Sequence, residues 1–322
     1  MGKSKVSLTK CLNYEPALVE GALEEVLAPL GGMRAFVKPG QRVMLKPNYV
    51  MARSVEEPAN THPVFTLAVA RLVQRAGATP FIADSPAFGS AAGVARRTGT
   101  LELAQAAGVE VCELRKGKMV QAHSTGNHRA LRISKELDQT DVLINLPKVK
   151  AHGQLYMSLC VKNLFGLVPG RRKALWHFQL SHDVMEFARM LIENYRAVRP
   201  TLHLVDGIVG MERRGPTRGD ARTLGIVAAG TDGIAVDRVL IELLGLPIEA
   251  MYTLRAAEEL GEGAFRMEDI EAVGASLDSL RVADFKPVEK MVPIGFSIPR
   301  ILRGVIKQIL TFAMDRHQPA EY

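Results

Sequence analysis

The chain has 322 residues, enough for one large domain or two, and its 47% hydrophobic and 23% charged content is ordinary for a folded globular protein. A formal net charge of +7 favours anionic partners, but an aromatic content of 6% and the lack of a long basic helix or tail argue against nucleic acid. No uninterrupted apolar run reaches the roughly 18 residues of a membrane-spanning helix and no signal peptide begins the chain, so we expect a cytoplasmic protein.

The three cysteines, Cys11, Cys112 and Cys160, lie far apart, and none belongs to a CxxC pair. This spacing is unlike that of structural zinc sites or iron–sulfur clusters. We therefore expect no disulfide framework and no iron–sulfur cluster ligated by this chain.

Strand-like and helix-like runs alternate along most of the chain. Strands are expected at 42–46, 79–83, 109–112, 142–146, 202–205 and 224–228, and helices at 63–76, 100–107, 156–165, 184–198 and 234–244. This alternation predicts an α/β fold with a mostly parallel sheet flanked by helices. In such a sheet the loops that follow the strands gather at one edge, which is where ligands bind.

The alternating pattern ends near residue 246. We therefore expect an α/β domain over residues 1–246 and a C-terminal extension over residues 247–322. The extension has irregular spacing until residues 298–314, where apolar residues return at helical intervals and basic residues occupy the other face. This segment is predicted to be an amphipathic helix that either docks on the domain or lies on an anionic membrane surface.

Positive charge is concentrated in residues 141–182. The predicted strand at 142–146 leads directly into this segment, whose only acidic residue is Asp141. Its cations are Lys148, Lys150, Lys162, Arg171, Arg172 and Lys173. A cationic loop at the ligand-binding edge of a parallel sheet predicts a site for an anionic small molecule.

Three groups of side chains in this segment suit chemistry on an anion. Lys148 and Lys150 point the same way if the strand geometry continues, and neighbouring lysines depress each other's pKa, although both could equally be solvated loop charges. Lys162 interrupts an apolar run, so beside Asn163 it is either an anion clamp or a covalent anchor for a cofactor, unless it reaches to solvent. His152 is a candidate general acid or base because imidazole titrates near neutral pH.

Loops after the earlier strands contribute further candidates. Lys46 ends the strand at 42–46 and Asn48 follows it, and Asp84 follows the strand at 79–83. Because the carboxyl ends of parallel strands meet at one edge, we expect these side chains near the lysines of residues 148–162.

Three further residues complete the predicted site. His62 stands at the start of the helix at 63–76, where Asn60 or Thr61 is the expected N-cap. Arg171 follows a Pro-Gly turn and could bind a carboxylate or phosphate through two hydrogen bonds. His177 is a candidate metal ligand, since neutral imidazole binds zinc or nickel.

The combination of these motifs resembles the domain of unknown function 362 family over about residues 40 to 245. The resemblance is carried by Lys46-Pro47-Asn48, the THP at 61–63, Asp84-Ser85, the run from Ile144 to Gly170, and VDGIVGMERRGP from Val205. Many members of that family carry a ferredoxin-like pair of cysteine clusters after this domain, and this chain has none. The resemblance implies that any iron–sulfur cluster would belong to a partner protein.

A more distant similarity is to nickel-dependent lactate racemases. In them a His is followed ten residues later by the Lys that carries a nickel-pincer nucleotide, then by a Pro-Gly turn and a nickel-ligating His. Here His152 and Lys162 are ten residues apart, Pro169-Gly170 follows, and His177 or His182 matches the later ligand. The racemase's glycine-rich segment before its Lys is replaced by residues 157–161, and its arginine-bearing turn lacks the arginine. The similarity implies a nickel or nucleotide-derived cofactor.

We therefore predict an enzyme that acts on a hydroxy acid or phosphorylated compound, of isomerase or redox type. In this hypothesis His152, Lys162, His62 and Asp84 are catalytic, Lys46, Asn48, Lys148, Lys150, Asn163 and Arg171 bind the cofactor, and His177 ligates a metal. The cofactor is left open between a metal ion (nickel, zinc or iron) and a nucleotide-derived group. The alternative is a non-catalytic redox or ligand-binding subunit that works with a ferredoxin-type iron–sulfur protein.

Overall fold

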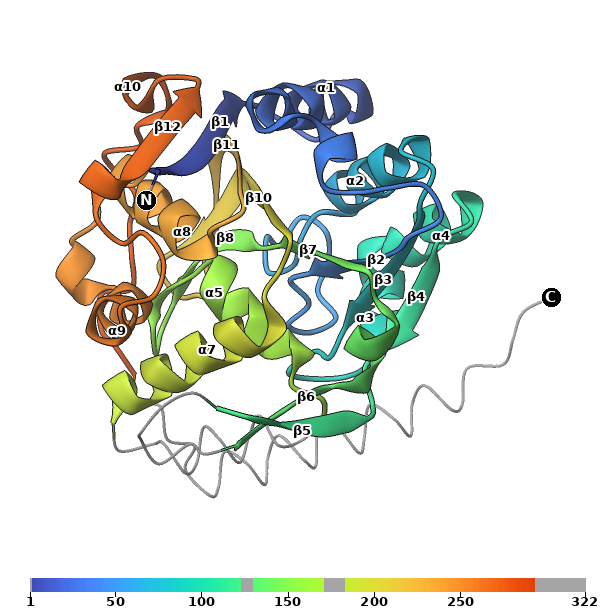
Figure 1. Cartoon of the computed structure of the whole chain (residues 1–322). Helices are drawn as coiled ribbons and strands as arrows, with labels where there is room; N and C mark the ends of the chain where they lie inside the picture. Colours follow the sequence, from blue (N-terminus) through green and yellow to red (C-terminus); the bar gives the residue numbers. More distant parts are fainter. Residues whose placement is uncertain (1, 123–129, 171–182, 293–322) are drawn as a thin grey trace.

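A single mixed sheet runs through the centre of the molecule in the computed structural model, which describes residues 2–122, 130–170 and 183–292 (Figure 1). Its strands lie in the order β12-β1-β11-β10-β7-β2-β3-β4, with β8 paired to β10 and β9 paired to β8. The strands are β1 (Ser4–Lys10), β2 (Arg42–Pro47), β3 (Thr79–Asp84), β4 (Glu110–Glu113), β7 (Val142–Leu146), β8 (Lys148–His152), β9 (Tyr156–Ser158), β10 (Leu202–Glu212), β11 (Asp220–Gly230) and β12 (Ile270–Gly274). A separate hairpin pairs β5 (Gly117–Gln121) with β6 (Ala130–Ser134).

Helices of very different length connect these strands. The α-helices are α1 (Pro16–Leu27), α2 (Pro63–Arg75), α3 (Ala91–Thr98), α4 (Thr100–Ala106), α5 (Cys160–Asn163), α7 (Val184–Val198), α8 (Gly233–Leu243), α9 (Tyr252–Leu260) and α10 (Leu277–Leu280). The short 3₁₀ helices are η1 (Ala28–Leu30), η2 (Met33–Ala35), η3 (Lys135–Gln139), η4 (Leu164–Leu167), η5 (Ile248–Ala250) and η6 (Met267–Asp269).

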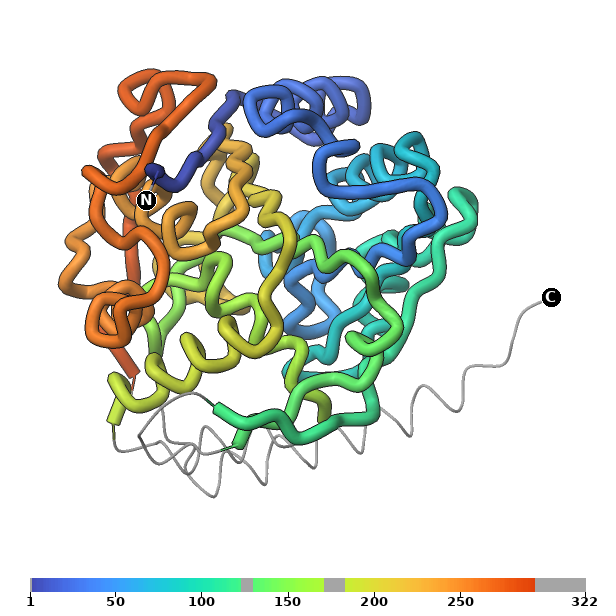
Figure 2. The backbone as a smooth tube through the Cα atoms, in the orientation of Figure 1, coloured from blue at the N-terminus to red at the C-terminus, as the bar shows by residue number. Residues whose placement is uncertain are grey.

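Most neighbouring strands are parallel. The pairs β12–β1, β10–β7, β10–β8, β7–β2, β2–β3 and β3–β4 are parallel, whereas β11 is antiparallel to both β1 and β10, and β9 is antiparallel to β8. The predicted mostly parallel α/β fold is therefore confirmed. Strand β12 comes from the region beyond residue 247, and Figure 2 shows this late segment lying beside the N-terminal strand.

Alternate residues of β2 show why helices cover both faces of the sheet. Val43 and Leu45 pack into a core with α1, α2, α3 and α4, whereas Met44 between them packs into a second core with α5, α7, α8 and α9. All three side chains are fully buried. A parallel strand covered on both faces reads as a continuous apolar run, which is how it was found in the sequence. Figure 1 shows the two groups of helices on opposite sides of the strands.

The order of the strands reverses beside β2. The chain adds β3 and β4 on one side of β2, then crosses over and adds β7 and β10 on the other side. Open α/β sheets bind their ligands outside the carboxyl ends of the strands at such a switch point. In this chain the switch point lies between β2 and β7. A ligand site is therefore expected among the residues that follow these two strands.

The predicted strand at 142–146 and the predicted helix at 184–198 match β7 and α7 residue for residue, and the other predicted elements overlap observed ones. The predicted helix at 156–165 is wrong in its first part, because residues 156–158 form β9 and the helix begins only at Cys160. A short apolar run does not distinguish a buried strand from a buried helix. Residues 148–152, expected to be a loop, form β8, which continues β7 alongside β10.

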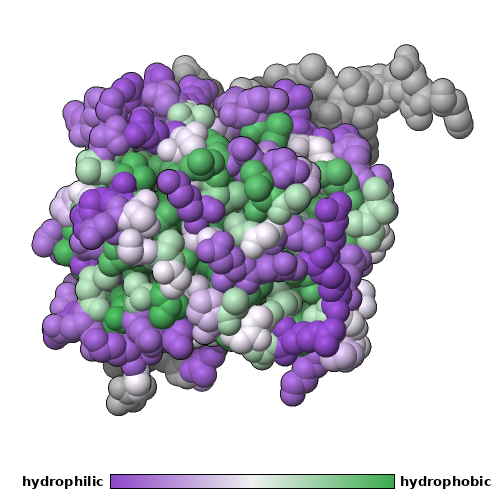
Figure 3. Space-filling model, turned by 90° about the horizontal axis from the view of Figure 1, so that it is seen from above, coloured by the Kyte–Doolittle hydropathy of each residue, from purple (hydrophilic) through white to green (hydrophobic). Residues whose placement is uncertain are grey.

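The face seen in Figure 3 is mostly hydrophilic, with hydrophobic residues in small groups between polar ones. Single exposed apolar residues of this kind are normal for a folded protein. Within the described residues no helix is both long enough and apolar enough to cross a membrane. The predicted amphipathic helix at 298–314 lies outside the described residues.

Candidate functional site

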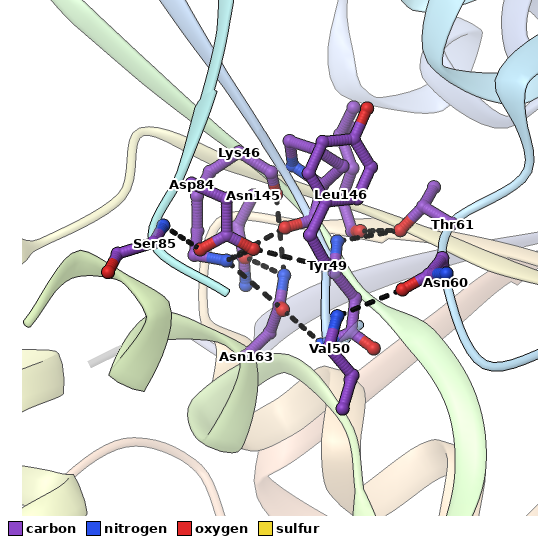
Figure 4. Close-up of polar contacts among 12 residues, drawn as sticks. Lys46, Tyr49, Val50, Asn60, Thr61, Asp84, Ser85, Asn145, Leu146 and Asn163 are labelled. Carbon is purple, nitrogen blue, oxygen red and sulfur yellow. Dashed lines mark hydrogen bonds and ion pairs between the residues drawn. The ribbon is translucent and has the colours of Figure 1, made fainter. Parts of the chain in front are cut away.

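A buried ion pair joins the carboxyl ends of β2 and β3. The Nζ atom of Lys46 lies 3.1 Å from Oδ2 of Asp84, and both side chains are 1% exposed or less. Asp84 also accepts hydrogen bonds from the backbone N–H groups of Tyr49 and Ser85, at 2.8 and 2.7 Å (Figure 4). Burial lowers the pKa of Lys46, and the charge of Asp84 opposes that shift. Every oxygen of Asp84 is thus committed to groups within the protein.

Gly166 in η4 packs directly on this ion pair. A Cβ atom at this position would overlap the carboxylate of Asp84 and the Nζ atom of Lys46. The carbonyl of Gly166 also accepts a hydrogen bond from the backbone N–H of Ser85, at 3.2 Å. Only glycine allows η4 to approach the pair this closely.

A chain of asparagine side chains ties α5 to the sheet. Asn163 Nδ2 donates to Asn145 Oδ1 at 2.8 Å and to the carbonyl of Lys46 at 3.3 Å. Asn163 Oδ1 accepts from Asn48 Nδ2 at 2.8 Å and from Lys46 Nζ at 3.3 Å. Asn145 lies on β7 and Asn48 follows β2, so these bonds span the switch point (Figure 4).

A second buried ion pair lies on the other side of the switch point. Lys148 Nζ is 2.9 Å from Asp206 Oδ2 and donates to the hydroxyl of Tyr14 at 2.5 Å. That hydroxyl donates in turn to Asp206 Oδ1 at 2.7 Å. The ring of Tyr14 stacks on the imidazole of His62, with centroids 3.5 Å apart. Tyr14, which the sequence interpretation missed, thus connects Lys148 with His62.

His62 itself is the N-cap of α2, in place of Asn60 or Thr61, which were expected there. Its Nδ1 atom accepts a hydrogen bond from the backbone N–H of Val64 at 3.2 Å. Burial lowers the pKa of His62 to about 4, although the nearby carboxylate of Asp206 acts in the opposite direction. The ring is therefore neutral at pH 7 with its proton on Nε2, which makes it a hydrogen-bond donor rather than a strong acid.

Two more lysines, Lys150 and Lys162, lie near the switch point, and neither pairs with a carboxylate among the described residues. Lys150 is 1% exposed and its Nζ atom donates to the carbonyl of Ala59 at 2.6 Å. Burial, followed by the charges of Lys162, Lys148 and Lys46, lowers its pKa well below the usual value. Among the described residues neither Lys150 nor Lys162 forms an ion pair, so four lysines here face two carboxylates.

Lys162 lies on α5 and is partly exposed, unlike the other three lysines. Its Nζ atom lies 5.0 Å from the centroid of the Phe165 ring. Burial and, to a smaller extent, the charge of Lys46 lower its pKa to about 8, and the charge of Asp84 partly opposes them. The ammonium group of Lys162 therefore begins to lose its proton at pH values close to neutral.

The remaining predicted residues are placed less completely. His152 ends β8, is 7% exposed, and accepts a hydrogen bond from the backbone N–H of Gln154 at Nδ1. Arg171 and His177 lie outside the described residues. Within residues 2–122, 130–170 and 183–292, no three His, Cys, Asp or Glu side chains come together as metal ligands would. The predicted roles in binding a metal or a nucleotide-derived cofactor stay predictions.

These features define an α/β protein with helices on both faces of its sheet and a lysine-rich polar site at its topological switch point. Residues 43–242, more than half of the chain, match the family model described as domain of unknown function (DUF362), and the chain belongs to that family. The resemblance found in the sequence is thus confirmed.

Known proteins give three further likenesses. The chain is similar to a thylakoid-associated protein of Synechocystis sp., with 43% identity over 302 residues that cover 94% of this chain and 93% of that protein. Among solved structures it is similar to a lactate racemase apoprotein from Thermoanaerobacterium thermosaccharolyticum, with 13% identity, a TM-score of 0.45, and coverage of 74% of this chain and 56% of that one. A Thermotoga maritima protein gives 10% identity, a TM-score of 0.43, and coverage of 78% and 59%. The chain spans little more than half of each of these solved chains.

The first prediction concerns the buried ion pair. Replacing Asp84 with Asn leaves Lys46 without its counter-charge and should lower the free energy of unfolding by about 3–5 kcal/mol. Urea denaturation of the two proteins measures the difference. Glu20→Gln removes a charge from the more exposed Glu20–Arg75 pair and should cost no more than about 1 kcal/mol. Equal losses in the two variants would contradict the structural role of the Lys46–Asp84 pair.

The second prediction concerns Gly166. Gly166→Ala forces a methyl group against Lys46 and Asp84 and should destabilise the protein by about 1–3 kcal/mol, measured as a shift of the urea midpoint. The matched control is Gly21→Ala in α1, where a Cβ atom meets nothing within 4 Å. Because alanine reduces the entropy of the unfolded chain, that variant should gain about 0.4–1 kcal/mol. A neutral Gly166→Ala variant would show that η4 does not press on the ion pair.

Proposed function

We propose that this protein is an enzyme whose site binds the anionic group of a small organic molecule through Lys150 and Lys162. The observation that carries the proposal is the surplus of lysines over carboxylates at the switch point, where the partners of Lys46 and Lys148 are already Asp84 and Asp206. A carboxylate or phosphate group would supply the missing negative charge. An anionic hydroxy acid or phosphorylated compound fits this requirement.

The energetics of burial support an anionic ligand. A buried ammonium group without a counter-charge is costly, so the protein lowers its pKa instead. The lowered pKa values of Lys150 and Lys162 have this origin, because burial is the largest cause of each. An anion placed between these lysines would restore their charged forms and bind strongly in the poorly solvated surroundings.

Lys162 has the properties of the proton-transferring group. With a pKa of about 8 it is present in both protonation states near neutral pH, which is where a general acid or base works best. On the side of the switch point where Lys148 pairs with Asp206, neutral His62 has an Nε2–H donor for a ligand oxygen. Proton transfer at a carbon next to a bound carboxylate is an isomerase type of reaction, and a redox reaction at that carbon would also need an electron acceptor such as an iron–sulfur partner. An iron–sulfur partner stays a prediction from the family resemblance.

The third prediction tests anion binding. We would titrate the protein with lactate, oxalate, phosphate and phosphoglycolate by calorimetry and expect one of them to bind at one site. Lys150→Met and Lys162→Met should each weaken that binding by about tenfold or more, which is about 1.4 kcal/mol. Lys38→Met is the matched control, because Lys38 is exposed and precedes the amino end of β2, at the opposite edge of the sheet. No binding by any of the four anions, or equal weakening in the control, would contradict the proposal.

The fourth prediction concerns pH. A bound anion raises the pKa of Lys162, so binding takes up a proton, and affinity should be highest below pH 8. Above pH 8 the free protein loses this proton, and affinity should fall by up to about tenfold for each pH unit. Lys162→Arg keeps its charge at every accessible pH and should give a flatter profile between pH 7 and 10. An unchanged affinity for the unmodified protein over that range would exclude the Lys162 ammonium as the partner.

We further propose that the protein associates with an anionic membrane surface through residues 298–314. The supporting observation is the thylakoid-associated name of the relative that is 43% identical over 94% of this chain. The sequence of the segment places basic residues among apolar ones at helical spacing, namely Ile298, Arg300, Ile301, Leu302, Arg303, Val305, Lys307, Ile309 and Phe312. Such a sequence binds a membrane by burying its apolar face and attracting anionic headgroups.

The fifth prediction is a vesicle flotation experiment. The intact protein should float with vesicles that contain phosphatidylglycerol and stay below with vesicles of phosphatidylcholine alone, and added salt should release it. A chain that ends before Ile298 should not float with either. Arg303→Glu in the intact chain should weaken flotation while leaving anion binding unchanged. Equal flotation of the intact and shortened chains would contradict this proposal.

A further inference from the structure

Helix α5 is too short to hold its own position. It has four residues, Cys160–Asn163, yet it carries both Lys162 and Asn163. A single turn of helix is not stable by itself, because the first hydrogen bond must fix several residues at once. The residue before it, Leu159, offers no side-chain cap. Contacts with other parts of the chain must therefore fix where Lys162 lies.

Asp237 supplies the missing cap from a different helix. It lies on α8 and is fully buried. Its Oδ1 atom accepts a hydrogen bond from the backbone N–H of Cys160 at 2.7 Å, and its Oδ2 atom accepts one from Val161 at 3.2 Å. Both N–H groups belong to the first turn of α5, where helical N–H groups have no partner within the helix.

The first turn of α5 is also hydrogen-bonded to the sheet. Asn145 on β7 donates a hydrogen bond from Nδ2 to the carbonyl of Cys160 at 3.0 Å. Cys160 is therefore held by its N–H toward α8 and by its carbonyl toward β7. With the start of α5 fixed between a helix and a strand, the position of Lys162 two residues later follows.

We propose that Asp237 is a positioning residue for Lys162, which holds α5 so that the lysine side chain reaches the anion site. This rests on the proposed function of Lys162 as the charged partner and proton-transferring group. Asp237 does not touch the ligand in this proposal and acts only through the backbone of α5.

The surroundings of Asp237 agree with a role in geometry rather than in stability. Among the described residues no cation pairs with it. Burial raises its pKa to about 7, and the hydrogen bonds from Cys160 and Val161 only partly offset that effect. A carboxylate buried at such a cost contributes little net stability. Its two hydrogen bonds nevertheless fix the direction of α5.

The experiment measures the pKa of Lys162 in the Asp237→Asn variant without any ligand. The rate of acylation of Lys162 by acetic anhydride, followed by mass spectrometry between pH 6 and 11, gives that pKa. In the unmodified protein it should be about 8. The Asn side chain keeps only one of the two acceptors that hold α5, so the ammonium group of Lys162 should become more hydrated and its pKa should rise by about one unit or more toward 10.5.

Asp232→Asn is the matched control. Asp232 accepts hydrogen bonds from the backbone N–H groups of Ile234 and Ala235 and so caps α8 itself. The Asn side chain keeps an oxygen that can cap α8, so this variant removes a nearby carboxylate charge and should leave the pKa of Lys162 unchanged. If Asp237→Asn lowers the melting temperature and leaves that pKa unchanged, Asp237 has a structural role only and the proposal is overturned.

The direction of the shift also decides the question. A direct effect of the Asp237 charge on Lys162 would make the pKa fall when the charge is removed, and this result would overturn the proposal too. Should Asp237→Asn fail to fold, Asp237→Ser likewise leaves a single acceptor and should raise the pKa of Lys162 in the same direction. The readout needs no ligand, so it remains decisive even if the anion titrations fail, and a failed titration would count only against the proposed function.

Discussion

The buried pair of Lys46 and Asp84 is the interaction on which the site depends. It links the carboxyl ends of β2 and β3, and its lysine also binds Asn163 of α5. The glycine at 166 lets η4 cover it closely. Desolvation makes a buried ion pair a poor source of net stability, so its contribution here is to geometry. It fixes three separate segments of the chain around one point before any ligand arrives.

The proposed function depends on an imbalance of charge rather than on any single residue. Asp84 and Asp206 neutralise Lys46 and Lys148, whereas buried Lys150 and partly exposed Lys162 have no carboxylate partner among the described residues. Burial, and after it repulsion from the other lysines, lowers the pKa of both Lys150 and Lys162. In the proposed function, an anion supplies the negative charge that these two lysines lack.

The part of this site that lies at the ends of apolar strands could be predicted from the sequence. Lys46 and Asp84 were found because the strands before them read as buried runs. Tyr14 was missed because its partner Lys148 is 134 residues away and because the strand β1 before it has polar residues buried at Ser7 and Thr9. Asn145 lies inside an otherwise apolar strand, where its hydrogen bonds to α5 leave no pattern in the sequence. The hydrophobic periodicity of a sequence does not show which polar groups pair over long distances along the chain.

The position of β1 in the sheet has a consequence for how the protein is made. Ser4–Lys10 lies between β11 and β12, whose residues come more than 200 positions later in the chain. Strand β1 leaves the ribosome well before β11 and β12, so both of its edges stay unpaired until those strands have been synthesised. Unpaired strand edges are sites of aggregation, and non-local pairing slows folding. The polar residues Ser7 and Thr9 lower the hydrophobicity of β1, and a less hydrophobic strand has a weaker tendency to aggregate while its edges are unpaired.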